Sequence, residues 1–354
     1  MEKAERSYSL DFLKILATIA IIFHHFQQVA DVKYDNFINF FGDWFYWGYL
    51  VEFFFVLSGY FMYRYISQIK KNGITLLDWW KKRALRLLPM VAISVVAFEV
   101  FLYSYSKIYQ ENWLGIEISV WGTVIASLGV QDGWGFVSPL LNNPIWYISV
   151  LIACYIIFYI LTSLAAKVKC SPMYFYAAMI FLGVGINVYN INLPFLNSSM
   201  GRGYYSFFFG LILAAYISKY GIKLKEIIFS VVCLAFFSYT IAIEWKYVGT
   251  NLVYNLTFLV FPALIILFET KLAKKIFSHK FWGTISAISF EAYLWHLPLL
   301  LLSYIFVKKY NWYESFENLR GMFIFLGIVC AVGTFVYFLI ERPVMKLIKS
   351  KSKN

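Results

Sequence analysis

Long apolar runs dominate this sequence and restrict it to one class of fold. Ten runs reach the roughly 20 residues that a helix needs to cross a bilayer. They lie near 9–30, 47–66, 86–106, 144–166, 172–190, 203–219, 225–245, 251–270, 283–307 and 321–341. Because 61% of the residues are hydrophobic and only 14% are charged, the composition excludes a soluble globular protein. We expect an all-α, polytopic membrane protein with about ten transmembrane helices.

The distribution of positive charge predicts the topology. A net charge of +12 would suggest nucleic acid as the partner of a soluble protein, but here Lys and Arg lie in short segments between apolar runs. There they orient the helices and contact lipid headgroups, and they concentrate on the side of the N-terminus. Both termini are therefore expected in the cytoplasm, with a single membrane domain over 1–345 and a short basic cytoplasmic tail over 346–354.

Three features refine this organisation. The first apolar segment is too long and too polar for a cleaved signal peptide, so we expect it to be retained as the first helix. The segment 114–130 is apolar but short and contains Glu117 and three glycines. If it crossed the membrane, the basic residues would divide almost evenly between the two sides, so it is expected to be re-entrant or interfacial. The four cysteines have neither paired nor metal-type spacing, and we expect no metal site.

The first helix has a polar stripe in an otherwise apolar surface. At about 100° per residue, Asp11, Lys14 and His25 fall within an arc of roughly 60°. Lys14 and His25 lie about 16 Å apart along the axis, one near the cytoplasm and the other past the midplane. Ionisable residues in a spanning helix indicate a functional site. In the alternative interpretation, Lys14 extends to the inner surface and His25 forms a hydrogen bond with another helix.

The second apolar run places a carboxylate close to the depth of His25. This run enters from the outer side, so Glu52 lies near its start. A carboxylate facing the imidazole of His25 would fix its tautomer and raise its basicity, as a general base requires. Alternatively, Glu52 only marks the outer interface. For Ser58 and Gly59 we favour close helix packing over a place in the substrate pocket.

A basic cluster precedes the third run at the inner surface. Arg83 and Arg86 are three residues apart and share one helix face. Two guanidinium groups at the start of a helix suit a phosphate ligand. The alternative is a set of positive charges that only fixes the orientation of the helix.

Three later residues are further pocket candidates. His296 lies near the middle of the ninth run, where it either lines a cavity or forms a hydrogen bond with a neighbouring helix. The structural role is favoured, because Pro298 frees backbone carbonyl groups that need partners. Trp146 and Tyr147 begin the fourth run at the outer face, where an aromatic belt is the default interpretation and stacking on a sugar ring is the alternative.

Taken together, these features resemble the membrane acyltransferase 3 family, integral-membrane O-acyltransferases that modify bacterial surface glycans. The resemblance covers nearly the whole chain and rests on five motifs in order. They are Lys14 and His25 in SLDFLKILATIAIIFHH, VEFFFVLSGY, Arg83 and Arg86 in KKRALRLLP, AYLWHLP, and Glu341, Arg342 and Pro343. The sequence departs from the family pattern at Lys14, where Arg is commoner, and at Leu151 and Ile152, where many members have acidic residues. It also ends before the C-terminal esterase-like domain of the longer members, so acceptors that require that domain are not expected.

The resemblance implies transfer of an acyl group, most often acetyl from acetyl-CoA, to a hydroxyl of an exported or surface polysaccharide. For this reaction, our hypothesis from the residues has His25 as general base with Glu52 and Lys14 as catalytic partners and Arg83 and Arg86 as the acyl-CoA site. The pocket candidates are Asp11, Ser58, Trp146, Tyr147 and His296. The partners would be acyl-CoA, a carbohydrate acceptor, membrane lipids and polysaccharide-synthesis machinery, in the bacterial cytoplasmic membrane. The residues leave open whether His25 is itself transiently acylated.

Two other classes of protein remain open from the sequence. A transporter or flippase for a polysaccharide precursor would also place His, Glu and Lys in membrane helices, but it usually has repeated halves, and none is visible here. A structural partner of a polysaccharide synthase would leave the polar stripe of the first helix unexplained.

Overall fold

The computed structural model describes residues 6–35, 37–43, 45–71, 73–136, 140–243 and 251–351. For residues 349–351 it describes the backbone alone. These residues form helices joined by turns and loops. The one β-type pairing among them is an isolated bridge between Leu193 and Leu196. The expected all-α fold is confirmed for the described part of the chain.

Six helices in the described residues are long and apolar enough to cross a membrane. They are Tyr8–Ala30 (α1), Leu76–Tyr109 (α4), Asn143–Lys167 (η4 and α6), Leu224–Ala242 (α9), Phe281–Tyr310 (α14) and Leu319–Ile348 (α16, η6 and part of α17). Two shorter apolar helices are Pro172–Val188 (α7) and Leu252–Phe268 (α11, η5 and α12). The chain is therefore a multi-pass membrane protein.

The remaining helices are short or more polar. They are η1 (Trp47–Tyr49), α2 (Leu50–Met62), η2 (Tyr63–Tyr65), α3 (Ile66–Lys70), η3 (Trp113–Gly115), α5 (Val120–Ser127), α8 (Ser198–Tyr220), α13 (Lys271–Ile276), α15 (Tyr313–Phe316) and α17 (Arg342–Lys351). Each of the ten predicted runs coincides with one or more helices, although the run near 225–245 extends beyond the described residues at 244. Six of the ten runs form helices that have both the length and the apolar composition needed to cross a membrane. The expected total of ten spans therefore remains a prediction.

The segment 114–130 has too little helix to cross a bilayer. It contains the end of η3, an extended stretch and the eight-residue α5, whose length is about 12 Å. The side chain of Glu99 in α4 accepts a hydrogen bond from the backbone N–H of Ser119 at 2.7 Å, which ties the segment to the spanning helix beside it. This geometry agrees with a re-entrant or interfacial segment.

Polar residues just before the helices determine where several of them begin. The side chains of Thr75, Asn197 and Asn318 accept hydrogen bonds from backbone N–H groups in the first turns of α4, α8 and α16. Such caps satisfy donors that have no partner within the helix. At α7, Ser171 caps the helix and Pro172 occupies its first position, where a missing N–H group has no cost.

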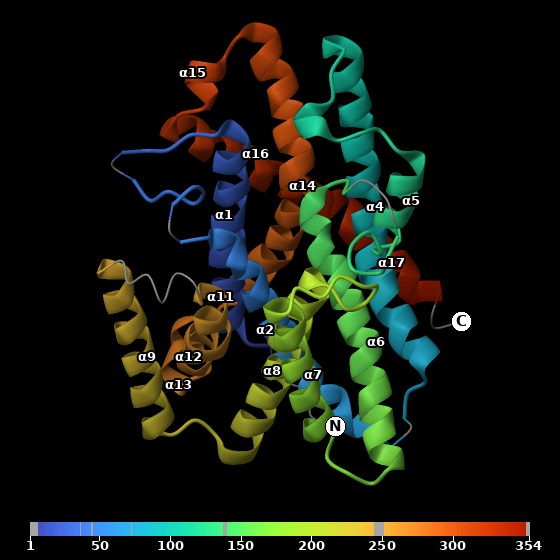
Figure 1. Cartoon of the computed structure of the whole chain (residues 1–354), viewed down its shortest axis with the longest axis vertical. Helices are drawn as coiled ribbons and strands as arrows, with labels where there is room; N and C mark the ends of the chain where they lie inside the picture. Colours follow the sequence, from blue (N-terminus) through green and yellow to red (C-terminus); the bar gives the residue numbers. More distant parts are fainter. Residues whose placement is uncertain are drawn as a thin grey trace.

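The helices form two groups that meet at the centre of the bundle. In the first group α1 packs against α14, and both pack against α16 (Figure 1). In the second group α8 lies between α2 and α7, with α6 also against it. The helix α9 lies at the side of the bundle with α12 and α13 (Figure 1), and most of its spanning stretch is exposed, as expected for a helix that faces lipid.

Glycines permit the close approach of α2 and α8. A Cβ atom added at Gly59 would lie 1.9 Å from the carbonyl oxygen of Phe207, and one added at Gly210 would lie 2.0 Å from that of Val56. The two helices therefore meet backbone to backbone, and the packing role predicted for Gly59 is confirmed. This contact fixes the depth of Glu52 relative to α8, which the site depends on.

We predict that Gly59→Ala destabilises the protein by about 1–3 kcal/mol, because the added methyl group forces α2 and α8 apart. Thermal unfolding in detergent, followed by intrinsic fluorescence, would measure the change. The matched control is Gly327→Ala in α16, where no neighbouring atom lies within 4 Å of the added carbon. If both variants unfold at the same temperature, the backbone contact does not limit the packing.

Candidate active site

A large cavity lies among the helix ends near the start of α1. Its volume is about 1160 Å³, and its walls come from α1, α2, α4, α6, α8 and α14 together with the loop residues around α13. Seven basic and three acidic residues line it, namely Arg6, Lys14, Arg64, Lys82, Arg83, Arg86 and Lys274, and Asp11, Glu269 and Glu341. This excess of positive charge suits an anionic ligand.

Arg83 and Arg86 both line the cavity, as the proposed phosphate site requires. The guanidinium carbon of Arg83 lies 3.0 Å from the centre of the Trp79 ring, and its Nη1 donates to the carbonyl oxygen of Trp79 at 3.0 Å. Arg83 is thus held firmly in place. The side chain of Arg86 is exposed at the rim and interacts electrostatically with Glu341. The pair combines one fixed guanidinium group with one that is free to reorient.

Lys14 and Asp11 belong to the wall of the same cavity. Asp11 is buried and accepts hydrogen bonds from Nε of Arg6 at 2.6 Å, Nζ of Lys14 at 3.0 Å and Oγ of Ser286 at 3.0 Å. Nζ of Lys14 also lies 4.7 Å from the centre of the Phe61 ring. Lys14 therefore points into a network within the bundle, with its charge balanced by Asp11.

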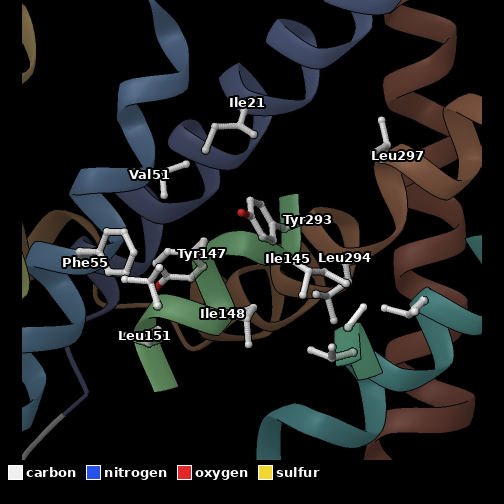
Figure 2. Packing of buried hydrophobic residues seen from close by; sticks show 14 of the residues in the cluster. Ile21, Val51, Phe55, Ile145, Tyr147, Ile148, Leu151, Tyr293, Leu294 and Leu297 are labelled. Carbon is white, nitrogen blue, oxygen red and sulfur yellow. The ribbon is translucent and has the colours of Figure 1, made fainter. Parts of the chain in front are cut away.

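Aromatic side chains close the deep end of the cavity. Phe54, Tyr147 and Tyr293 line it, and the rings of Tyr147 and Tyr293 lie 6.0 Å apart. Figure 2 shows these two tyrosines from α6 and α14 reaching into the same layer of the core. The hydroxyl of Ser58 lies 3.1 Å from that of Tyr147, so Ser58 lines the cavity and its predicted packing role is incomplete. The aromatic-belt interpretation of Tyr147 is wrong, because its ring is buried in the protein.

Two histidines lie just beyond this floor. The imidazole rings of His25 and His296 stack with centres 5.1 Å apart, and the His296 ring lies 5.8 Å from that of Tyr293. His25 is partly exposed and does not line the cavity. Its Nδ1 is 3.0 Å from Oε1 of Gln28, which can only accept, so Nδ1 carries the hydrogen and Nε2 has a free lone pair. That tautomer is the one that a general base needs.

The predicted contact between Glu52 and His25 is not formed. Both oxygens of the fully buried Glu52 accept from Arg202 of α8, at 2.5 Å from Nε and 3.0 Å from Nη2. Arginine and carboxylate form two parallel hydrogen bonds here, so both oxygens of Glu52 face Arg202 and not the imidazole of His25. Gln28 takes the orienting position that we expected for Glu52.

Trp146 belongs to the surroundings of this ion pair. The guanidinium carbon of Arg202 lies 4.6 Å from the centre of the Trp146 ring and 5.6 Å from that of Tyr49. Tyr49 in turn contacts Tyr46, and Tyr46 contacts the imidazole of His24. We call Tyr46, Tyr49, Glu52, Arg202 and Trp146 the outer cluster. Trp146 therefore stacks on a cation inside the protein and is absent from the cavity wall.

His296 forms a hydrogen bond within its own helix, which differs from both predicted roles. Its Nδ1 donates to the carbonyl oxygen of Tyr293 at 2.7 Å, and its Nε2 is buried without a partner. The carbonyl group that Pro298 frees is that of Leu294, and it accepts from Nδ2 of Asn142 at 3.0 Å. Because Asn142 fills that need, His296 is available for other contacts.

Sequence reasoning missed Arg202 and Gln28. Arg202 directly precedes the apolar run near 203–219, so the hydropathy pattern does not include it in the predicted helix. In the structure α8 begins at Ser198, which places Arg202 within the helix. Gln28 is an uncharged residue one turn after His25, and only its spacing on the helix could have indicated the contact. No group of three or more His, Cys, Asp or Glu is arranged to hold a metal ion in the part of the chain described.

The fold and the site define a helical membrane protein with a basic cavity at one end, an aromatic floor and a histidine pair behind it. The acyltransferase domain family model matches residues 7–342, so the chain belongs to the membrane acyltransferase 3 family.

Two relatives show the same similarity over nearly the whole chain. The peptidoglycan O-acetyltransferase OatA of Listeria monocytogenes is 24% identical over 96% of this chain and 56% of its own length. The O-acetyltransferase OatA of Staphylococcus aureus is 23% identical over 98% of this chain and 59% of its own length. The chain thus spans less than two thirds of the length of these relatives. No solved structure matches it.

We predict that Arg202→Met destabilises the protein by about 3 kcal/mol, because it leaves the charge of Glu52 buried and unpaired. The double variant Glu52→Gln with Arg202→Met should recover part of that loss. Thermal unfolding of the single and double variants would test the coupling, with Arg320→Met at the exposed start of α16 as the control. If the losses of Glu52→Gln and Arg202→Met simply add in the double variant, the two residues do not share an ion pair.

Proposed function

We propose that this protein is an integral-membrane O-acyltransferase that moves an acyl group, most often acetyl, from acyl-CoA to a hydroxyl of a cell-envelope glycan. The observation that supports this most directly is the continuity from the basic cavity through Tyr147 and Tyr293 to the histidine pair. The family membership and the names of the two relatives favour the same reaction.

In this proposal the donor enters from the end of the bundle where α1 begins, which we assign to the cytoplasm. Arg83 and Arg86 bind the phosphates of CoA, and Lys14 adds positive charge deeper in the cavity. The thin pantetheine arm then reaches the aromatic floor. The cavity volume and the excess of basic lining residues support this placement.

The acyl-transfer step uses His25 as general base. Nε2 of His25 takes the proton of the acceptor hydroxyl, the hydroxyl oxygen forms a bond to the carbonyl carbon, and the carbon–sulfur bond of the thioester breaks. The proton on His25 then passes to the departing thiolate, which leaves as the thiol. The rings of Tyr293 and His296 lie between the cavity and His25, so both must give way when the thioester arrives.

The acceptor is assigned to the opposite end, at the outer cluster. Its tyrosine and tryptophan rings offer flat apolar faces to a sugar, and the ion pair of Glu52 and Arg202 positions the edge of that surface. Glu52 would act through Arg202, whose position it holds, and on the packing of α2 against α8, without touching His25. The glycan named for the Listeria relative, peptidoglycan, is the first acceptor to test.

We predict that His25→Ala lowers acyl transfer by about 10²–10⁴-fold while the protein still inserts and folds, because only proton removal is lost. The assay follows acetyl-CoA consumption and O-acetyl ester formation with the purified protein in proteoliposomes. His279→Ala, at an exposed histidine near α13, is the control and should keep full activity. A His25→Ala protein with wild-type turnover would remove the base assignment, and glycan flux without ester formation would favour transport.

Arg86→Gln should weaken CoA binding about tenfold or more, because it removes charge-assisted hydrogen bonds to phosphate. Titration calorimetry with CoA measures this directly. Lys81→Gln removes a nearby exposed charge that does not line the cavity and serves as the control. An unchanged affinity of the Arg86 variant would count against the phosphate site.

A further inference from the structure

A fully buried carboxyl group and a half-buried one lie together at one wall of the cavity and have no role in the reaction described above. Glu291 of α14 is fully buried, and neither of its oxygens has a hydrogen-bond partner of good geometry. It interacts with Glu341, which ends the π-helical turn η6 and lines the cavity. One oxygen of Glu341 is also buried without a partner.

Among the described residues, one cationic side chain acts electrostatically on Glu341, namely that of Arg86. Arg86 of α4 interacts with Glu341 from the cavity side, and the indole of Trp295 interacts with Glu291 from its own helix. Two neighbouring carboxylates, one of them fully buried, are costly to ionise together, because each charge raises the energy of the other. With one guanidinium group beside two carboxyl groups, the balanced state is one carboxylate, one proton and Arg86.

The same Arg86 belongs to the phosphate site of the proposed donor. A phosphate group in the cavity draws the guanidinium group away from Glu341 and places a second negative charge in front of that carboxylate. The pair then holds a negative charge in the bundle with no cation opposite it. A proton from bulk water, entering through the cavity, is the simplest way to neutralise it.

We propose that Glu291 and Glu341 form a proton-binding site coupled to the donor, so that a polyphosphate ligand entering the cavity is accompanied by uptake of a proton by the carboxyl pair. This inference rests on the proposed function for the identity of the ligand. After the acyl group has been transferred and CoA leaves, Arg86 returns to Glu341 and the proton is released. Binding of the ligand in the cavity is thus coupled to the protonation state of Glu291 and Glu341. In the absence of the ligand, the carboxylate of Glu341 positions Arg86.

The test is titration calorimetry of CoA into the purified full-length protein at pH 8, in two buffers with different ionisation enthalpies. At that pH the terminal phosphate of CoA is already fully charged and takes up no proton of its own. We expect the observed enthalpy to rise with the buffer ionisation enthalpy, with a slope that corresponds to uptake of up to about one proton per CoA. Glu341→Gln and Glu291→Gln should both remove this slope.

Glu117→Gln, an exposed carboxylate before α5, is the matched control and should keep the slope of the wild-type protein. Binding of CoA with equal enthalpy in the two buffers would overturn the coupling and leave the proposed donor in place. Absence of CoA binding by the wild-type protein would overturn the donor assignment and the coupling together. A slope that persists in a folded Glu341→Gln protein would place the proton on other groups and would overturn the assignment to the carboxyl pair.

Discussion

The compensation of charges inside an apolar bundle is the constraint on which this structure depends. A charged side chain among membrane-crossing helices is costly unless a partner or a water-filled space accommodates it. Among the described residues, Asp11 balances Lys14 and Arg202 balances Glu52. Glu291 shares its site with another carboxyl group, that of Glu341, so this pair holds one charge with a proton. Each pair links different parts of the bundle or borders the cavity. The positions of the charged residues therefore help to determine the shape of the site.

Close helix packing makes the second contribution. The contact between α2 and α8 at Gly59 and Gly210 brings the two backbones together. This approach allows the short reach from Glu52 to Arg202 and places Ser58 against Tyr147 at the floor of the cavity. A bundle with larger residues at the two glycines would separate the ion pair and open the floor. The geometry of the site therefore follows from residues that have no chemical function themselves.

The sequence predicted the broad features well and the contacts less well. Apolar runs identified the helices, and Arg83 and Arg86, whose spacing predicts a shared helix face, both line the cavity. The predicted partner of His25, Glu52, is wrong, because the depth of a residue in the membrane does not determine how two helices are rotated toward each other. Glu52 is bound by Arg202 of α8, and that helix begins earlier than its apolar run suggests. Pairings between distant segments depend on packing that no local pattern encodes.

The central claim is that the donor occupies the basic cavity with its reactive end toward the histidine pair. The most direct test is an electron cryomicroscopy structure of the protein with CoA bound. The account predicts the phosphates beside Arg83 and Arg86 and the thiol at the floor formed by Tyr147 and Tyr293, with the ring of Tyr293 displaced. CoA bound at the outer cluster, or lying in the cavity with its thiol toward the rim, would contradict it.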